Sequence, residues 1–206
     1  MRPILPSPNP MPDFRALTLY VLRHGECEHN VEGRIASVDD SPLTPKGRQQ
    51  ARANGERLKD LASDLAVLDF HASSLHRACV TMELMRLAAG LPQTGYRADH
   101  RLMEMNSGDQ IWLKWSDISA WDHDAYRADP WNFARIGGEN QAMVYERVGN
   151  FLGGLNRDAV IVTHQVPLRM IRGHYLGLKP EEIVRYAHPR VGIMRLCAGT
   201  ESYFGD

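Results

Sequence analysis

Hydrophobic runs of strand length alternate along this chain with longer segments whose apolar residues recur every three or four positions. The apolar runs predict β-strands at residues 16–21, 66–72, 159–163 and 191–196, and a weaker extended segment at 95–102. Helical spacing predicts helices at residues 45–61, 75–89, 144–155 and 167–175, and a short one from 180. Strands that alternate with helices predict an α/β fold: a three-layer α/β/α sandwich around a mostly parallel central sheet.

Two segments differ from this pattern. Residues 109–135 hold all 4 tryptophans of the chain and predict a small helical insert of one or two short helices beside the sheet. Residues 1–14 contain five prolines and no long apolar run, so they predict a Pro-rich N-terminal arm and not a signal peptide. We expect residues 15–206 to form a single domain.

Composition limits the classes of partner and the cellular compartment that we expect for this chain. The formal net charge of −1 gives no reason to expect a nucleic-acid or anionic-membrane partner, and no apolar run reaches the length of a membrane span. Cys27, Cys79 and Cys197 are odd in number and far apart, which favours a reducing compartment and a cytoplasmic protein. The sequence leaves a homodimer open.

Polar residues follow three of the predicted strands. Arg23 and His24 come after the first, with Gly25 expected to allow a sharp turn that brings both side chains into one crevice. Arg77 follows the second strand and His164 follows the strand at 159–163. Because α/β sheets bind ligands beyond the carboxyl ends of their strands, we expect these side chains to converge. Arginine forks and imidazoles in such a place suit a phosphate.

Three further features of these segments bear on the site. Ser73 and Ser74 are expected to be structural, one of them capping the following helix. Arg77 lies in the first turn of that helix, where the helix dipole disfavours a cation, so an anion is expected to share the site. The histidine pairs at 24 and 29, and at 71 and 76, have a spacing that puts no two rings on one helical face, so no metal site is predicted.

A set of short motifs occurs in a fixed order, and together they resemble the histidine phosphatase superfamily, in its phosphoglycerate-mutase-like branch. The matching residues are 22–26 with Asn30, Gly33-Arg34, residues 40–44, Gly47, Ser73-Ser74 with Arg77, Leu102 with Glu104, residues 137–139, and Thr163-His164. Arg-His-Gly alone would be weak evidence, whereas the ordered set is strong.

The resemblance implies that His24 is a nucleophile that becomes phosphorylated and that Glu104 is the proton donor. It implies that Arg23, Arg77 and His164 bind the phosphoryl oxygens, with Asn30 assisting, and it implies no metal or other cofactor. Elementary chemistry agrees with these roles. Phosphoryl transfer needs mainly positioning and positive charge around the oxygens, and a neutral imidazole is a usable nucleophile near pH 7.

The chain also departs from the family pattern. Gln165 stands where glycine usually follows the second histidine, and Cys27 where threonine is common; Gln165 is expected to bind the substrate. We expect a metal-independent phosphatase that hydrolyses a small phosphomonoester, with a small phosphorylated metabolite as its partner. The sequence does not identify that ester.

Two alternatives stay open at this point. The first is a phosphoglycerate mutase, which returns the phosphoryl group to an organic acceptor. Glu104 and His164 are only 60 residues apart, and the insert holds few basic groups, which favours hydrolysis. The second is a non-catalytic module that binds phosphate without turnover.

Overall fold

A computed structural model describes residues 13–187, 189 and 191–205 of the chain. The predicted N-terminal arm lies outside the described residues except for its last two positions. There Asp13 accepts a hydrogen bond from the backbone N–H of Arg15 at 3.0 Å and caps a 3₁₀ turn, Phe14–Ala16. This turn delays the start of the first strand.

The described strands form one six-stranded sheet in the order β3-β2-β4-β1-β5-β6. The strands are β1 (Leu19–Arg23), β2 (Asp69–Ser73), β3 (Arg97–Asp99), β4 (Ala159–Thr163), β5 (Ile193–Cys197) and β6 (Thr200–Phe204). The first four are mutually parallel, whereas β5 and β6 pair antiparallel at one edge. The prediction of an α/β fold with a mostly parallel sheet is confirmed.

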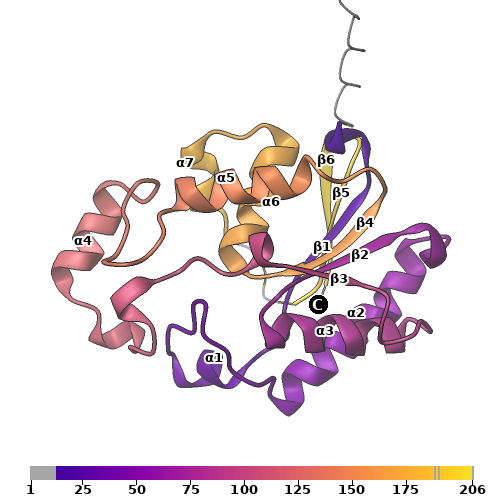
Figure 1. Cartoon of the computed structure of the whole chain (residues 1–206), viewed down its shortest axis with the longest axis horizontal. Coiled ribbons are helices and arrows are strands. Elements are labelled where there is room, and N and C mark those ends of the chain that lie inside the picture. The colour runs from indigo at the N-terminus through magenta and orange to yellow at the C-terminus, as the bar shows by residue number, and fades with distance from the viewer. Residues whose placement is uncertain (1–12, 188, 190, 206) are drawn as a thin grey trace, which may run out of the picture.

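Helices cover both faces of this sheet (Figure 1). One face carries α2 (Pro45–Leu61) and α3 (His76–Ala88); the other carries α5 (Gln141–Leu152) and α6 (Gln165–Leu176), with α7 (Pro180–Arg185) against α6. Successive side chains of β1 point to opposite faces of the sheet. Leu19 and Val21 therefore join the core under α5 and α6, whereas Tyr20 and Leu22 join the core under α2 and α3. Burial of each such side chain contributes about 1.5–3 kcal/mol.

The register between β1 and β4 positions the site. Arg23 is opposite Thr163, and the backbone N–H of His24 donates to the Thr163 carbonyl at 2.9 Å. The two central parallel strands therefore end at the same level, and the residues that follow them, His24 and His164, emerge side by side.

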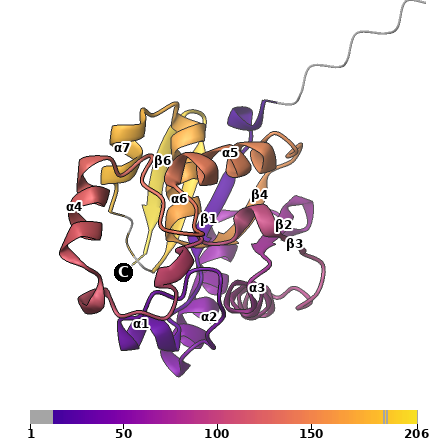
Figure 2. The ribbon, with the colours of Figure 1, turned by 60° about the vertical axis from the view of Figure 1, so that its left-hand side comes forward.

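The Trp-rich insert consists of short helical elements. It forms 3₁₀ turns at Gly108–Gln110 and Trp115–Asp117 and the helix α4 (Ala120–Ala128). Figures 1 and 2 both place α4 away from the sheet, on the same side of the molecule as the short helix α1 (Glu28–Glu32). The predicted helical character of the insert agrees with the structure, whereas α4 does not pack beside the sheet as expected and has no buried residue.

Several predicted boundaries are wrong. β1 and β2 begin three residues later than predicted, because residues 14–16 and 65–67 form 3₁₀ turns. Helix α6 begins two residues before Pro167, since a first-turn proline lacks only an N–H that the helix would leave unpaired. α1 and β6 were not predicted; the residues of β6 are mostly exposed and lack an apolar run.

Gly25 has a role different from the one predicted. Its φ angle is not positive, so the turn does not require glycine for its backbone conformation. A Cβ atom on Gly25 would lie 2.3 Å from the Gly47 carbonyl oxygen, and one on Gly47 would lie 2.0 Å from the Glu26 carbonyl oxygen. The two glycines allow the segment after His24 to pack against the first turn of α2. None of the described helices has the length and apolar character needed to cross a membrane.

Candidate active site

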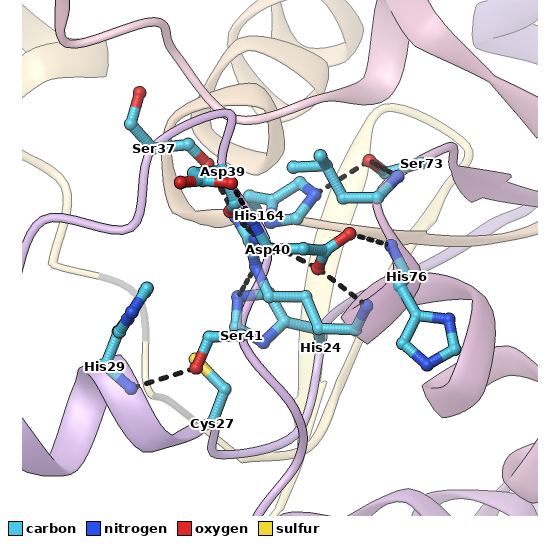
Figure 3. A network of polar contacts seen from close by, with 12 residues as sticks. His24, Cys27, His29, Ser37, Asp39, Asp40, Ser41, Ser73, His76 and His164 are labelled. Atoms are coloured by element: carbon cyan, nitrogen blue, oxygen red, sulfur yellow. Dashed lines mark hydrogen bonds and ion pairs between the residues drawn. The ribbon is translucent and has the colours of Figure 1, made fainter. Parts of the chain in front are cut away.

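A cavity of about 410 Å³ opens at the carboxyl ends of the parallel strands and extends towards the insert. Six of the seven residues singled out in the sequence line it: Arg23, His24, Asn30, Arg77, Glu104 and Gln165. The seventh, His164, is fully buried beside His24, with ring centroids 4.9 Å apart and ring planes at 56° (Figure 3). The structure therefore brings all seven together at one end of the sheet.

The hydrogen bonds of His24 fix which ring nitrogen carries the proton. Nδ1 lies 2.7 Å from the carbonyl oxygen of Gly25, and because a carbonyl only accepts, Nδ1 is the protonated nitrogen. The lone pair is then on Nε2, to which Arg77 Nε donates at 3.3 Å. Burial, and next the positive charges of Arg23 and Arg77, hold the pKa of His24 well below its usual range. His24 is therefore a neutral imidazole near pH 7, with its lone pair beside an arginine.

Arg77 is 1% exposed and is held by backbone carbonyls. Its Nη1 donates to Asp39 O at 2.6 Å and its Nη2 to Ser37 O at 2.7 Å. Asp40 accepts the N–H groups of His76 and Arg77, at 2.5 and 3.2 Å, so it caps α3 from 36 positions away in sequence (Figure 3). The prediction that Ser73 or Ser74 caps this helix is therefore wrong. The anion expected at the helix end is the protein's own Asp40.

His164 is bound by a serine. Its Nε2 lies 2.8 Å from Ser73 Oγ, which also accepts the N–H of Leu75 at 3.3 Å (Figure 3). Its Nδ1 is buried without a hydrogen-bond partner. Burial, followed by the charge of Arg77, holds the pKa of His164 well below its usual range. If the Ser73 hydroxyl donates to Nε2, the ring proton resides on Nδ1 and forms an N–H donor for an anion.

We expect Ser73→Ala to weaken the binding of inorganic phosphate about three- to tenfold, because it removes one hydrogen bond that fixes the His164 tautomer. Calorimetry measures the affinity, and the ¹⁵N resonances of His164 report the tautomer. Ser74→Ala is the matched control, since Ser74 is exposed. Unchanged affinity together with unchanged ring resonances would contradict this role for Ser73.

Glu104 lies at the N-terminus of α6. Its Oε1 accepts the backbone N–H groups of Met105 at 2.9 Å and Val166 at 3.2 Å, and its Oε2 accepts that of Gln165 at 3.0 Å. A carboxylate is favoured at a helix N-terminus by the dipole as well as by these bonds. The Gln165 side chain accepts from Arg23 Nη1 at 3.4 Å. These contacts connect Glu104 and Gln165 to the strand end that carries His24.

Side chains of α5 and β4 hold the segment that ends at Glu104. Arg147 on α5 pairs with Glu139 at 2.9 Å and donates to the Glu104 carbonyl at 3.2 Å. Thr163 Oγ1 donates to the Leu102 carbonyl at 2.7 Å. Arg147 was missed from the sequence because no local pattern indicates a contact 43 positions away. The predicted Asn30 lines the cavity, and its Oδ1 accepts the backbone N–H of Cys27 at 3.2 Å, so it also caps α1.

The lowered histidine pKa values predict acid sensitivity of the fold. Burial is the largest cause of the lowered pKa of His24, His71, His164 and His174. Below about pH 6.5 the unfolded chain takes up protons that these folded side chains do not bind, so stability is complete above that pH and is lost as pH falls. We expect the free energy of unfolding to fall between pH 7 and 5, by up to about 1.4 kcal/mol per pH unit for each histidine.

Urea unfolding at pH 7.5, 6.5 and 5.5 measures this dependence. His24→Asn removes one of the four histidines and is expected to reduce the slope. A stability that stays constant or rises as the pH falls through this range would show that these histidines are not held neutral by the fold.

Within the described residues, no group of three or more His, Cys, Asp or Glu side chains is arranged to hold a metal ion. The cavity offers a neutral imidazole whose Nε2 lone pair faces Arg77, a second imidazole buried beside it, further guanidinium groups, and a carboxyl group at a helix end.

Comparison with known proteins places this arrangement in a family. The family model of the histidine phosphatase superfamily (branch 1) matches residues 19–203. A relative from Salmonella paratyphi A, named probable phosphoglycerate mutase GpmB, is 31% identical over 171 residues, covering 79% of this chain and 76% of the relative.

Solved structures have the same fold. YhfR from Bacillus stearothermophilus superposes with a TM-score of 0.75 at 27% identity, covering 93% of this chain and 96% of that one. The alpha-ribazole phosphatase from Shigella flexneri has a TM-score of 0.74 at 24% identity, with 92% and 95% coverage, a likeness of fold alone. Since the family model spans all but the last residue of the sheet and every residue that lines the strand-end site, this chain belongs to the histidine phosphatase superfamily, branch 1.

Proposed function

We propose that this protein is a metal-independent phosphatase that hydrolyses a small phosphomonoester through a phosphohistidine intermediate on His24. One observation carries the proposal: His24 donates its Nδ1 proton to Gly25 and presents the Nε2 lone pair beside Arg77 in the cavity. Because Nε2 carries no proton, the imidazole needs no general base to activate it before it attacks phosphorus. The cavity volume is that of a site for a small-molecule ligand.

In the first step, Nε2 of His24 attacks phosphorus and the bond between phosphorus and the ester oxygen breaks. Arg23, Arg77 and His164 bind the phosphoryl oxygens, whose charge they stabilise in the transition state. Glu104 gives a proton to the departing alkoxide, which leaves as an alcohol. The products of this step are phosphohistidine and the carboxylate of Glu104.

In the second step, water attacks the phosphorus atom of phosphohistidine. The Glu104 carboxylate takes a proton from this water, the bond between phosphorus and Nε2 breaks, and inorganic phosphate is released. Glu104 is then protonated and Nε2 regains its lone pair, so the enzyme returns to its starting state. Asn30 and Gln165 complete the substrate contacts in this scheme.

The test is turnover of a panel of phosphomonoesters, with acid-quenched samples examined for a phosphorylated protein. We expect hydrolysis that persists in excess chelator, together with an acid-labile and alkali-stable phosphoryl label on His24. The proposal fails if no ester in the panel is hydrolysed, or if the label is found on another residue.

Phosphoglycerate mutase activity is the second candidate, because the relative from Salmonella paratyphi A is named probable phosphoglycerate mutase GpmB. A mutase would return the phosphoryl group from His24 to an organic acceptor instead of water. Of the basic residues of the insert, His123 and Arg135 line the cavity, whereas Arg127 is exposed and pairs with Asp124. Interconversion of phosphoglycerates faster than hydrolysis of every ester in the panel would favour the mutase.

A further inference from the structure

Arg169, in the N-terminal half of α6, lines the cavity without an anionic partner. Its Nε is buried and lacks a hydrogen-bond partner, and its guanidinium forms no hydrogen bond or ion pair with any residue between 13 and 205 that the structure describes. The Arg169 side chain is half-buried, and an unpaired donor at its buried Nε is costly, so such atoms are rare in folded proteins. A ligand group in the cavity would satisfy this guanidinium.

Three other partly buried arginines of the chain have carboxylate partners, whereas Arg86 is held by backbone carbonyls. Arg172, three positions further along the same helix, pairs with Glu201 through two bonds of 2.5 and 2.8 Å. Arg147 pairs with Glu139 at 2.9 Å, and Arg101 pairs with Asp99 at 2.6 Å. Arg169 differs from these arginines by facing the cavity and not a carboxylate of the protein.

The helix fixes where Arg169 lies relative to the phosphoryl end of the cavity. Gln165 and Arg169 are four residues apart, so they lie on the same face of α6, about 6 Å apart along its axis. Gln165 contacts Arg23, and its N–H is bound by Glu104. Arg169 therefore lies one helical turn beyond the residues that surround the ester oxygen in the proposed mechanism.

We propose that Arg169 is a specificity-determining residue that binds a carboxylate of the substrate, one helical turn from the phosphoryl group. The substrate is then a phosphomonoester in which a short carbon chain also bears a carboxylate. This inference rests on the proposed phosphatase function. The guanidinium of Arg169 carries one positive charge, which matches the single charge of a carboxylate, and its planar fork binds that group through two parallel hydrogen bonds.

The test compares esters that differ in one carboxylate. Phosphoglycolate is paired with ethyl phosphate, and 3-phosphoglycerate with glycerol 3-phosphate. We expect the wild type to prefer the acidic member of each pair by about ten- to a hundredfold in kcat/KM, the range of a charge-assisted hydrogen-bonding contact. Arg169→Gln should lower this ratio at least about tenfold. Arg172→Gln, which removes the same charge from the same helix outside the cavity, should retain the ratio.

The two proposals fail separately. A wild-type ratio near one, or an Arg169→Gln variant that keeps the wild-type ratio, overturns the role of Arg169 while hydrolysis itself still stands. Should Arg169→Gln not fold, Arg169→Lys keeps the charge but not the fork. It should lose part of the preference through a higher KM for the acidic ester, and an unchanged preference overturns the inference.

If the wild type hydrolyses no ester, the phosphatase function fails, and binding decides the role of Arg169. Calorimetric titration then measures the affinity of the wild type and of Arg169→Gln for phosphoglycolate and for ethyl phosphate. A tenfold preference for phosphoglycolate that the variant loses supports the carboxylate site, and the absence of any preference overturns it.

Discussion

His24→Ala is expected to reduce kcat/KM for every phosphomonoester by about 10⁴-fold or more and to abolish the acid-labile phosphoryl label. The physical reason is that, among the residues that the structure describes, no other side chain presents an unprotonated nitrogen at this position. Burial and two neighbouring arginines hold the ring neutral, and Nδ1 is bound to the Gly25 carbonyl. Removal of a covalent nucleophile generally has an effect of this size. Steady-state rates and acid-quenched labelling measure the two consequences.

Controls separate this loss from unfolding. Removal of the His24 ring leaves a cavity between Arg77 and His164 but removes a buried group that resists protonation, so the variant should stay folded at neutral pH. His100→Ala is the matched control, because that side chain is 83% exposed. A His24→Ala variant that still accumulates a phosphoryl label would show that another residue is the nucleophile.

The fold could be predicted from sequence where local physics decides it. Residues 45–61 were predicted as a helix with those bounds, since Thr44 caps it and Pro45 occupies its first position. β4 was predicted with its bounds because all five of its residues are buried and apolar or small. β6 could not be predicted, because an edge strand that is largely exposed has no apolar signature.

The site shows the same division between local and long-range causes. The sequence could predict that Arg23, Arg77 and His164 lie together, because the carboxyl ends of parallel strands meet at one edge of a sheet. The cap of α3 by Asp40 and the contact of Ser73 with His164 join positions 36 and 91 residues apart. Such contacts follow from the packed fold, and sequence patterns within one element carry no information about them.

Glu104→Gln is expected to separate the two chemical steps according to the leaving group. An alkoxide needs a proton as it departs, so hydrolysis of alkyl phosphates should fall about 10²- to 10⁴-fold. A nitrophenolate leaves without protonation, so phosphorylation of His24 by nitrophenyl phosphate should be much less affected. Glutamine cannot take a proton from water, so the second step should be slow with either substrate.

One rapid-mixing experiment tests both expected effects of Glu104→Gln. Rapid mixing of Glu104→Gln with nitrophenyl phosphate should release one nitrophenolate per active site in a burst, followed by slow turnover, whereas an alkyl phosphate should give no burst. Glu83→Gln is the matched control, because Glu83 accepts a hydrogen bond from Tyr96 at 2.9 Å outside the cavity.

Glu104 also anchors the start of α6, so loss of rate through a displaced helix must be distinguished from loss of proton transfer. A displaced helix would slow both esters by a similar factor and produce no burst, since Gln165 would then move with it. Only a proton donor gives a loss of rate that depends on the leaving group, because the geometry of the cavity is the same for both esters while the proton demand of their oxygens differs.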